Sequence, residues 1–222
     1  MATKMCFAVG TDKAFEERIV EFEYIKGMAF SQKQKNVLSF HKAISNKFPG
    51  SRIIEISTKS QSDLGVRLSA FNLRLDGFPL ECVFQSSKVF EGGVQLSYLL
   101  TAEPKEAKQL VREQGLPLVG FRYKGEAFDA LPRTMFYDYI YISALLQSNI
   151  DIVKIADCDI FTDIEFNEKK QINCQARACA IYAYMLRNRS VEYYMSSKER
   201  FKELYSARSS EPRAAEQLTL LI

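Results

Sequence analysis

The chain of 222 residues contains no tryptophan and only one histidine, His41. A serine–histidine triad would therefore have to use His41 as its base, and the sequence has no Gly-x-Ser-x-Gly nucleophile elbow. His41 lies on the apolar face of a helix expected over residues 32–48, where a histidine is more often a packed residue than a catalytic base. The sequence therefore argues against an ordinary serine hydrolase.

Cysteine pairs with metal-ligand spacing are also missing. The five cysteines are odd in number, include no Cys-x-x-Cys pair, and each lies among apolar residues: Cys6, Cys82, Cys158, Cys174 and Cys179. With one histidine to complete a site, structural zinc is disfavoured, so we predict neither a metal nor a cofactor. Isolated cysteines of this kind are typical of buried free thiols, which favours a reducing, cytoplasmic setting.

The chain has no long hydrophobic run and no strong excess of one charge. No segment approaches the roughly 18 apolar residues of a membrane span, and the first ten residues are too short a patch for a signal core. Thirty basic and 27 acidic residues give a net charge of +3, with 47% hydrophobic residues. This composition is typical of one soluble domain without membrane contact, and it neither favours nor excludes nucleic acid, since phosphate binding depends on local clustering.

Apolar periodicity divides the chain into helices and short strands. Alternation of period two predicts strands within residues 1–30 and over residues 52–57, 67–75 and 118–123. Helical spacing predicts helices over residues 32–48, 104–114, 132–148 and 171–189, and another that Pro79 opens. We therefore expect an α+β fold, a helix-rich single domain with a small β-sheet over residues 1–205. A polar stretch then predicts a C-terminal tail, residues 206–222, with an apolar tip.

The helix opened by Pro79 carries the most informative pattern. Glu81, Gln85 and Lys88 stand at i, i+4 and i+7, which would place three polar groups on one helical stripe within an otherwise apolar segment. Such a stripe is usually solvated surface. Here an expected strand and a turn at residues 76–77 bring Ser69 and Asn72 close to the first helical turn, which favours a small-molecule site.

Two motifs in this region, Ser-Ala-Phe-Asn at residues 69–72 and Glu-x-x-Phe-Gln-x-x-Lys-x-Phe at residues 81–90, resemble the NADAR superfamily of YbiA-like N-glycosidases. Segments at residues 56–60, 85–93, 136–141, 161–167 and 173–177 resemble the NADAR antitoxins that accompany DarT toxins. Two departures stand out. Val94 and Gln95 replace an expected Pro-Tyr, and Tyr139 replaces a common Trp, so base stacking would fall to Phe or Tyr.

The resemblance implies cleavage of an N-glycosidic bond, whose oxocarbenium-like transition state needs a carboxylate near the ribose C1 atom. Glu81 is the first catalytic candidate, and Lys88 would hold its charge, meet a phosphate or attack an opened sugar. Asp163 matches the acidic residue that precedes the last helix in the superfamily. If residues 162–165 form an extended strand, the side chains of Asp163 and Glu165 point to the same side of it. The alternative for Asp163 is a carboxylate that caps a helix or forms a turn.

The other predicted site residues would bind the substrate. Asn173, Gln175 and Arg177 open the last helix, where N–H groups and a guanidinium suit a pyrophosphate. Aromatic residues would stack on the base, and Asp138 would support the pocket or pair with a cation. The predicted substrate-binding residues are Ser69, Phe71, Asn72, Phe84, Gln85, Asp138, Asn173, Gln175 and Arg177, with Tyr137 as a further stacking candidate.

The resemblance therefore predicts an ADP-ribosyl glycohydrolase that removes ADP-ribose from guanine in DNA and so acts as an antitoxin. Its expected partners are ADP-ribosylated DNA or ADP-ribose, with a DarT-like toxin as a further partner. Two alternatives remain open. The first is an antitoxin without catalysis that covers its toxin, which the apolar C-terminal tip and the Val94-Gln95 departure keep open. The second is an N-glycosidase acting on a riboflavin-pathway intermediate.

Overall fold

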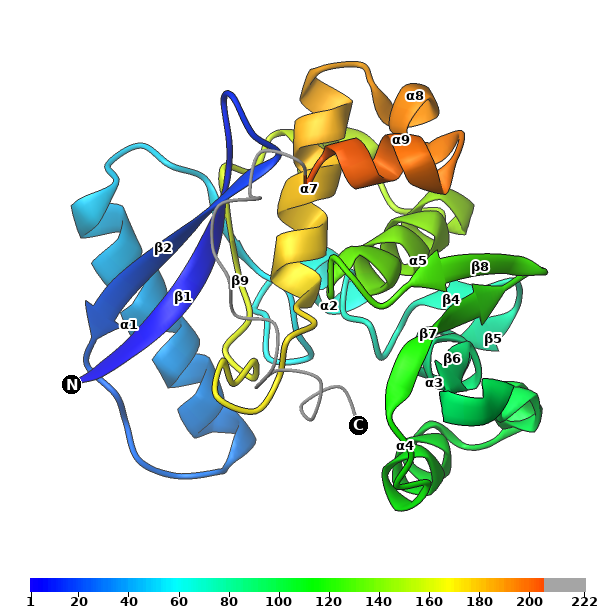
Figure 1. The fold of residues 1–222 in the computed structure, drawn as a ribbon. Helices are drawn as coiled ribbons and strands as arrows, with labels where there is room; N and C mark the ends of the chain where they lie inside the picture. The colour runs from blue at the N-terminus through cyan, green and yellow to red at the C-terminus, as the bar shows by residue number, and fades with distance from the viewer. Residues whose placement is uncertain (206–222) are drawn as a thin grey trace.

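A computed structural model describes residues 1–205 of the chain, so the predicted tail at residues 206–222 lies outside the described residues. The described part combines helices with small sheets in one domain, which confirms the expected α+β class. In Figure 1, β1, β2 and α1 form one side of the molecule, α3, α4 and β4–β8 form the other, and α7 lies between them.

The larger sheet has the strand order β2-β1-β9-β3. Its strands are β1 (Ala2–Val9), β2 (Phe15–Phe22), β9 (Ile160–Thr162) and β3 (Ile53–Glu55). β1 is antiparallel to both neighbours, whereas β3 and β9 are parallel. Successive residues of β1 are buried on opposite faces, Phe7 in one core cluster and Cys6 with Ala8 in another. Both faces of this sheet are therefore covered.

Helices α1 (Phe30–Lys47) and α7 (Gln175–Arg187) pack against this sheet. Phe40 and Ile44 of α1 join the cluster that contains Cys6 and Ala8, while α7 belongs to the larger cluster on the other face. His41, one residue from Phe40, is partly buried, and its Nε2 atom lies 2.8 Å from Thr162 Oγ1. Burial lowers the pKa of His41 to about 4, so the ring is neutral at physiological pH, as expected of a packed histidine.

The second part of the molecule contains an antiparallel sheet with the strand order β6-β7-β8 and a short hairpin of β4 and β5. Its strands are β4 (Arg74–Leu75), β5 (Phe78–Pro79), β6 (Lys88–Phe90), β7 (Leu118–Tyr123) and β8 (Glu126–Asp129). The remaining helices are α2 (Asp63–Arg67), α3 (Leu80–Ser86), η1 (Glu91–Gly93), η2 (Ser97–Thr101), α4 (Pro104–Glu113), α5 (Met135–Gln147), α6 (Ile152–Ala156), α8 (Val191–Met195) and α9 (Lys198–Glu203).

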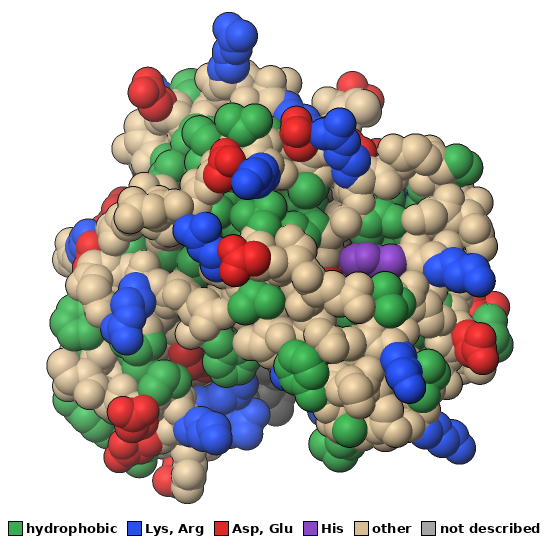
Figure 2. Space-filling model, turned by 180° about the vertical axis from the view of Figure 1, so that it is seen from behind, with side chains coloured by type: hydrophobic (Ala, Val, Ile, Leu, Met, Phe, Trp, Pro, Cys, Tyr) green, Lys and Arg blue, Asp and Glu red, His purple; other side chains and the backbone are tan. Residues whose placement is uncertain are grey.

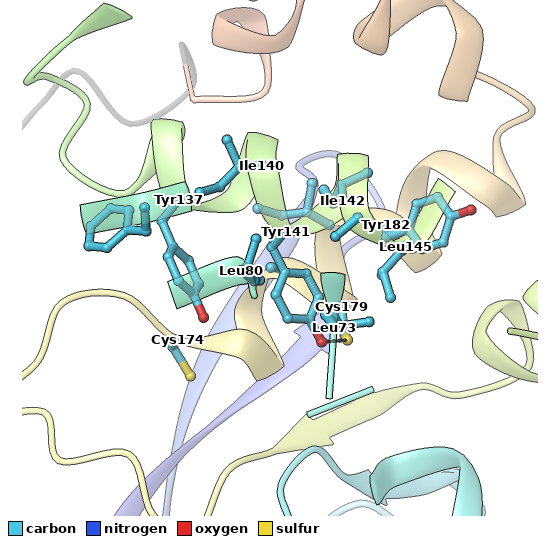
Figure 3. Close-up of a cluster of buried hydrophobic side chains, with 14 of the residues drawn as sticks. Leu73, Leu80, Tyr137, Ile140, Tyr141, Ile142, Leu145, Cys174, Cys179 and Tyr182 are labelled. Atoms are coloured by element: carbon cyan, nitrogen blue, oxygen red, sulfur yellow. Dashed lines mark hydrogen bonds between the residues drawn. The ribbon is translucent and has the colours of Figure 1, made fainter. Parts of the chain in front are cut away.

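Helix α5 is buried on nearly all sides and packs against α7. Figure 3 shows side chains of α5 meeting those of α7 and of the segments around Leu73 and Leu80. The Tyr141 hydroxyl donates a hydrogen bond to the Leu68 carbonyl and lies 3.2 Å from Cys179 Sγ. This contact fixes the loop before β4 against the α5–α7 core, because Leu68 directly precedes that loop.

Three predicted boundaries are wrong. The helix opened by Pro79 ends at Ser86, because the Ser86 and Ser87 hydroxyls bond back to the Val83 carbonyl and residues 88–90 pair with β7. The strand predicted over residues 67–75 is mostly a turn, and only Arg74–Leu75 is extended. The last helix begins at Gln175 instead of residue 171.

Candidate functional site

A cavity of about 430 Å³ lies between α3 and α4 on one side and the loop after β9 on the other. Its volume is that of a typical small-molecule site. Four separate stretches of chain form most of the wall, namely residues 57–58, 69–71, 81–88 and 163–175, and Tyr137, Lys108 and Arg112 complete it. Figure 2 shows the molecule hollowed at its lower edge, with Lys and Arg side chains beside the hollow.

Glu81 is the second residue of α3, and its half-buried carboxylate lines this cavity. Its Oε1 atom accepts a hydrogen bond of 2.8 Å from Gln85 Nε2, one helical turn later. Gln85 is only 4% exposed, so it holds the carboxylate from the buried side. The Glu81 side chain thus faces a partly closed cavity that Lys88 and Asp163 also line.

Lys88 lines the same cavity although the helix ends two residues before it. As the first residue of β6 it is 2% exposed, and its ammonium lies 5.0 Å from the centre of the Phe84 ring. Burial lowers the pKa of Lys88 to about 8, and the charge of Glu81 opposes that shift. A buried amine with such a pKa is partly neutral at cellular pH.

Asp163 follows β9 and forms a turn instead of continuing the strand. Its Oδ1 atom accepts the N–H groups of Glu165 at 3.0 Å and Phe166 at 3.1 Å, and Oδ2 accepts Gln175 Nε2 at 2.9 Å. The prediction of an extended segment that places Asp163 and Glu165 on one side is therefore wrong, since β9 ends at Thr162. The turn carboxylate nevertheless lines the cavity.

The pKa of Asp163 is raised to about 7, first by burial and then by the neighbouring carboxylate of Glu55. Glu55 is 2% exposed and accepts hydrogen bonds from Ser57 Oγ at 2.6 Å, Thr162 Oγ1 at 2.6 Å and the Ile164 N–H at 2.8 Å. A second buried carboxyl thus lies behind Asp163, and burial also raises the pKa of Glu55.

Six of the nine predicted substrate-binding residues line the cavity: Ser69, Phe71, Phe84, Gln85, Asn173 and Gln175. Phe71 is 80% exposed at the mouth, whereas Ser69 is fully buried. Three polar atoms of this set, namely Ser69 Oγ, Gln85 Oε1 and Asn173 Oδ1, are buried without a hydrogen-bond partner in residues 1–205. These atoms are available to a bound ligand.

Asn72, Asp138 and Arg177 do not line the cavity. Asn72 is exposed and donates to the Val66 carbonyl at 2.7 Å. Arg177 turns toward α5, where its Nε and Nη2 atoms donate to the two oxygens of Asp138 at 2.9 and 3.0 Å. This pair is buried and joins α5 to α7, so we assign it to the packing of the two helices.

The sequence reasoning missed part of the cavity wall. Lys108 and Arg112 of α4 follow the buried residues Ala107 and Val111, a pattern that could have placed them at the edge of the packed face. Ser57 and Thr58 lie in the segment at residues 56–60 that resembles the family, whereas Lys170 on the wall and Glu55 behind it carry no comparable signal. Within residues 1–205, no group of three or more His, Cys, Asp or Glu side chains is placed to hold a metal ion.

All five cysteines are free thiols, and four of them are buried. In the same described part of the chain, no helix is both long and apolar enough to cross a membrane.

Comparison with known proteins relates the chain to one family. The family model described as DarT1-associated NADAR antitoxin matches residues 2–215, which is nearly the whole sequence. Curated proteins give no match. The match runs past residue 205, so the predicted boundary between domain and tail stays a prediction. The chain belongs to the family of DarT1-associated NADAR antitoxins.

Proposed function

We propose that this antitoxin is an N-glycosidase that removes ADP-ribose from guanine in DNA, and so reverses a modification made by its toxin. Family membership supports the antitoxin role in a DarT system. The observation that carries the enzymatic part is the convergence of Glu81, Lys88 and Asp163 on one partly closed cavity. Five free thiols fit a reducing cytoplasm, where such a DNA repair reaction would take place.

Hydrolysis would use the two cavity carboxyls in different roles. Glu81 would stabilise positive charge developing at the ribose C1 atom. Asp163, with a pKa of about 7, keeps its proton in a large fraction of molecules at neutral pH and would donate it to the departing base. Water supplies the hydroxyl that ends on C1. Burial and the neighbouring Glu55 carboxylate thus suit Asp163 to the role of the acid.

Lys88 has two chemically distinct uses in this cavity. As a cation it would hold the Glu81 carboxylate and the charge of the sugar–phosphate unit. As a neutral amine, which a pKa of about 8 allows, it would attack C1 of the ring-opened ribose, where that carbon is an imine to the base. The C1–base bond would break, the base would leave as the free amine, and water would hydrolyse the resulting Lys88–C1 imine. Treatment with borohydride during turnover distinguishes them, because only the covalent adduct is trapped by reduction and seen as an added mass on Lys88.

The test is cleavage of the N-glycosidic bond in three substrates offered to the pure protein, measured as release of ADP-ribose from the two DNA substrates and of the free base from the third. These are DNA with ADP-ribosylated guanine, DNA with ADP-ribosylated thymine, and a riboflavin-pathway intermediate. We expect turnover of the guanine substrate. Turnover of the riboflavin intermediate alone would replace the proposed substrate. A stable one-to-one complex with the toxin, together with no turnover of any substrate, would make the chain a binding antitoxin.

Glu81→Gln is the matching variant. It keeps the hydrogen-bonding shape of residue 81 but removes the negative charge, so we expect turnover to fall by about 100-fold or more, with unchanged folding by circular dichroism. Glu91→Gln is the control, because Glu91 is an exposed carboxylate outside the cavity wall. Equal turnover by the Glu81→Gln variant and the wild type would remove Glu81 from the mechanism.

A further inference from the structure

Helix α4 places two cations side by side at the mouth of the cavity. Lys108 and Arg112 both line it, and they are one helical turn apart. Ala107 and Val111, the residues just before them, are buried and fix α4 to the core beside α3. The two side chains therefore start from the edge of a packed helix face, on a rigid element instead of a loose loop.

The charges of Lys108 and Arg112 act inside the cavity. Burial is the main cause of the lowered pKa of Lys88, and the charges of Lys108 and Arg112 lower it further, as expected of cations that line the same cavity. In residues 1–205, no carboxylate lies within 4 Å of either cation. Like charges at i and i+4 repel each other. An anion bound between them would relieve that repulsion.

Within residues 1–205, the opposite wall adds no unpaired carboxylate at the mouth. Its exposed side contributes Lys170, and its acidic residue, Glu165, contacts Lys33 and lies 3.9 Å from Lys59. Glu165 is thereby neutralised by two lysines. Lys and Arg side chains are gathered at the edge of the hollow in Figure 2. The other carboxylates of the cavity, Glu81 and Asp163, are the proposed catalytic residues.

We propose that Lys108 and Arg112 bind the diphosphate of the ADP-ribosyl group and so make the site specific for ADP-ribosylated over simply ribosylated bases. This inference rests on the proposed function, which puts the ribose C1 atom beside Glu81. The diphosphate is attached through C5 of that same ribose, so the group next to the ribose is an anion. A guanidinium fork binds phosphate through paired hydrogen bonds, and a nearby ammonium adds a point charge.

Phosphates of the DNA backbone offer the same chemistry as the diphosphate. The position of Lys108 and Arg112 on the wall shared with Lys88 favours the diphosphate, since cations that serve DNA alone need only the outer surface. The two sources are separated by measuring free ADP-ribose, inorganic pyrophosphate and unmodified DNA as independent ligands.

The experiment compares the wild type with the double variant Lys108→Met/Arg112→Gln. The charge-matched control is Lys105→Met/Arg122→Gln, because Lys105 and Arg122 are exposed and outside the cavity wall. Calorimetry gives Kd for ADP-ribose and for pyrophosphate, and kinetics with ADP-ribosylated DNA give KM and kcat. We expect the double variant to bind ADP-ribose about tenfold more weakly or worse, to lose pyrophosphate binding, and to raise KM more than it lowers kcat.

Four outcomes decide the proposal. Equal Kd values for wild type and double variant, or no binding of ADP-ribose by the wild type, would overturn it. Loss of DNA binding with unchanged ADP-ribose affinity would assign the cations to the DNA backbone and also overturn it. If the wild type releases no ADP-ribose but binds it through these two residues, the diphosphate site stands and the glycosidase proposal fails.

Discussion

At the scale of single residues, the proposed site depends on the different surroundings of two carboxyls, Glu81 and Asp163. Glu81 stands on a helix with an amide partner and partial access to water. Asp163 is 7% exposed and next to Glu55, so its charged form is disfavoured by burial and by a like charge. Environment, and not residue type, therefore separates the proposed anion from the proposed acid.

The first residue-scale prediction concerns the pH dependence of turnover. If Asp163 donates a proton, kcat/KM should decline as pH rises above about 7, because the deprotonated fraction of a group with that pKa grows with pH. Asp163→Asn should lower turnover by about 100-fold and remove this decline. Steady-state kinetics between pH 5 and pH 9 measure both effects.

A substitution at Glu55 provides a matched comparison for this pH profile of turnover. Glu55→Gln removes the like charge behind Asp163, so the pKa of Asp163 should fall and the decline should begin at lower pH. An Asp163→Asn variant that keeps the wild-type profile would show that another group supplies the proton.

Some residues of the cavity could be predicted from the sequence and others could not. Glu81, Gln85 and Lys88 share one wall, as predicted, but through a helix followed by a strand instead of a continuous helix. The sequence did not indicate that Glu55 is buried, because a carboxylate in an Ile-Ile-Glu strand is normally expected to face solvent. Its burial depends on Thr162 and Ile164, which are more than 100 residues away.

At the scale of elements, the contact between α5 and α7 centres on a buried ion pair. The side chains of Arg177 and Asp138 are 6% and 0% exposed, and the Tyr205 hydroxyl donates to Asp138 Oδ2 at 2.6 Å. Arg177 also donates to the Ile172 carbonyl at 3.0 Å, which holds the loop that forms one side of the cavity. A pair outside the cavity thus fixes part of its wall.

Removing one partner of this pair should be costly. Arg177→Met leaves the Asp138 carboxylate buried without its cation, and we expect the free energy of unfolding to fall by about 3–5 kcal/mol. The double variant Arg177→Met/Asp138→Leu removes both charges and should recover part of that loss. Urea denaturation measures the difference.

Arg52→Met is the control for this element-scale prediction. Arg52 pairs with Asp157 at 2.9 Å, but their side chains are 67% and 58% exposed, so its loss should cost less than about 1 kcal/mol. If Arg177→Met costs no more than Arg52→Met, the buried pair does not hold α5 against α7.

The boundaries of elements were predictable where local chemistry alone decides them. The strand over residues 118–123 matches β7, and Pro104 opens α4 with Gly115 just past its end. The predicted boundaries were wrong where contacts with distant parts of the chain determine the structure and the local sequence pattern does not. Val89 and Phe90 pair with β7, and residues 69–72 form a turn held to α5 through Leu68 and Tyr141.

At the scale of the whole molecule, the cavity exists only because four distant stretches of chain meet. Motif order in the sequence therefore indicated the family and most of the wall, but not the cations of α4 or the carboxyl behind Asp163. Those depend on how α4 and β3 pack, and packing of this kind leaves little periodic trace in a single sequence. The C-terminal end of the domain is equally hard to place from the sequence, because it too depends on packing.

The last prediction tests where the domain ends. Tyr205 is 8% exposed and bonded to Asp138, so a folded domain must include it. We expect a chain truncated after Tyr205 to match the full-length protein within about 0.5 kcal/mol in its free energy of unfolding and to keep its turnover. Truncation after Leu204 should cost about 3 kcal/mol or more, since it removes a packed ring and a buried hydroxyl partner.

Urea denaturation of the two truncated chains and the full-length chain decides this, with turnover measured in parallel. The family match to residue 215 supplies the competing expectation, that residues 206–215 belong to the domain. If truncation after Tyr205 lowers the free energy of unfolding by well above 1 kcal/mol, residues 206–215 belong to the folded domain. Unchanged stability combined with loss of toxin binding would instead assign residues 206–222 to the partner, because only the contact with the toxin would then depend on them.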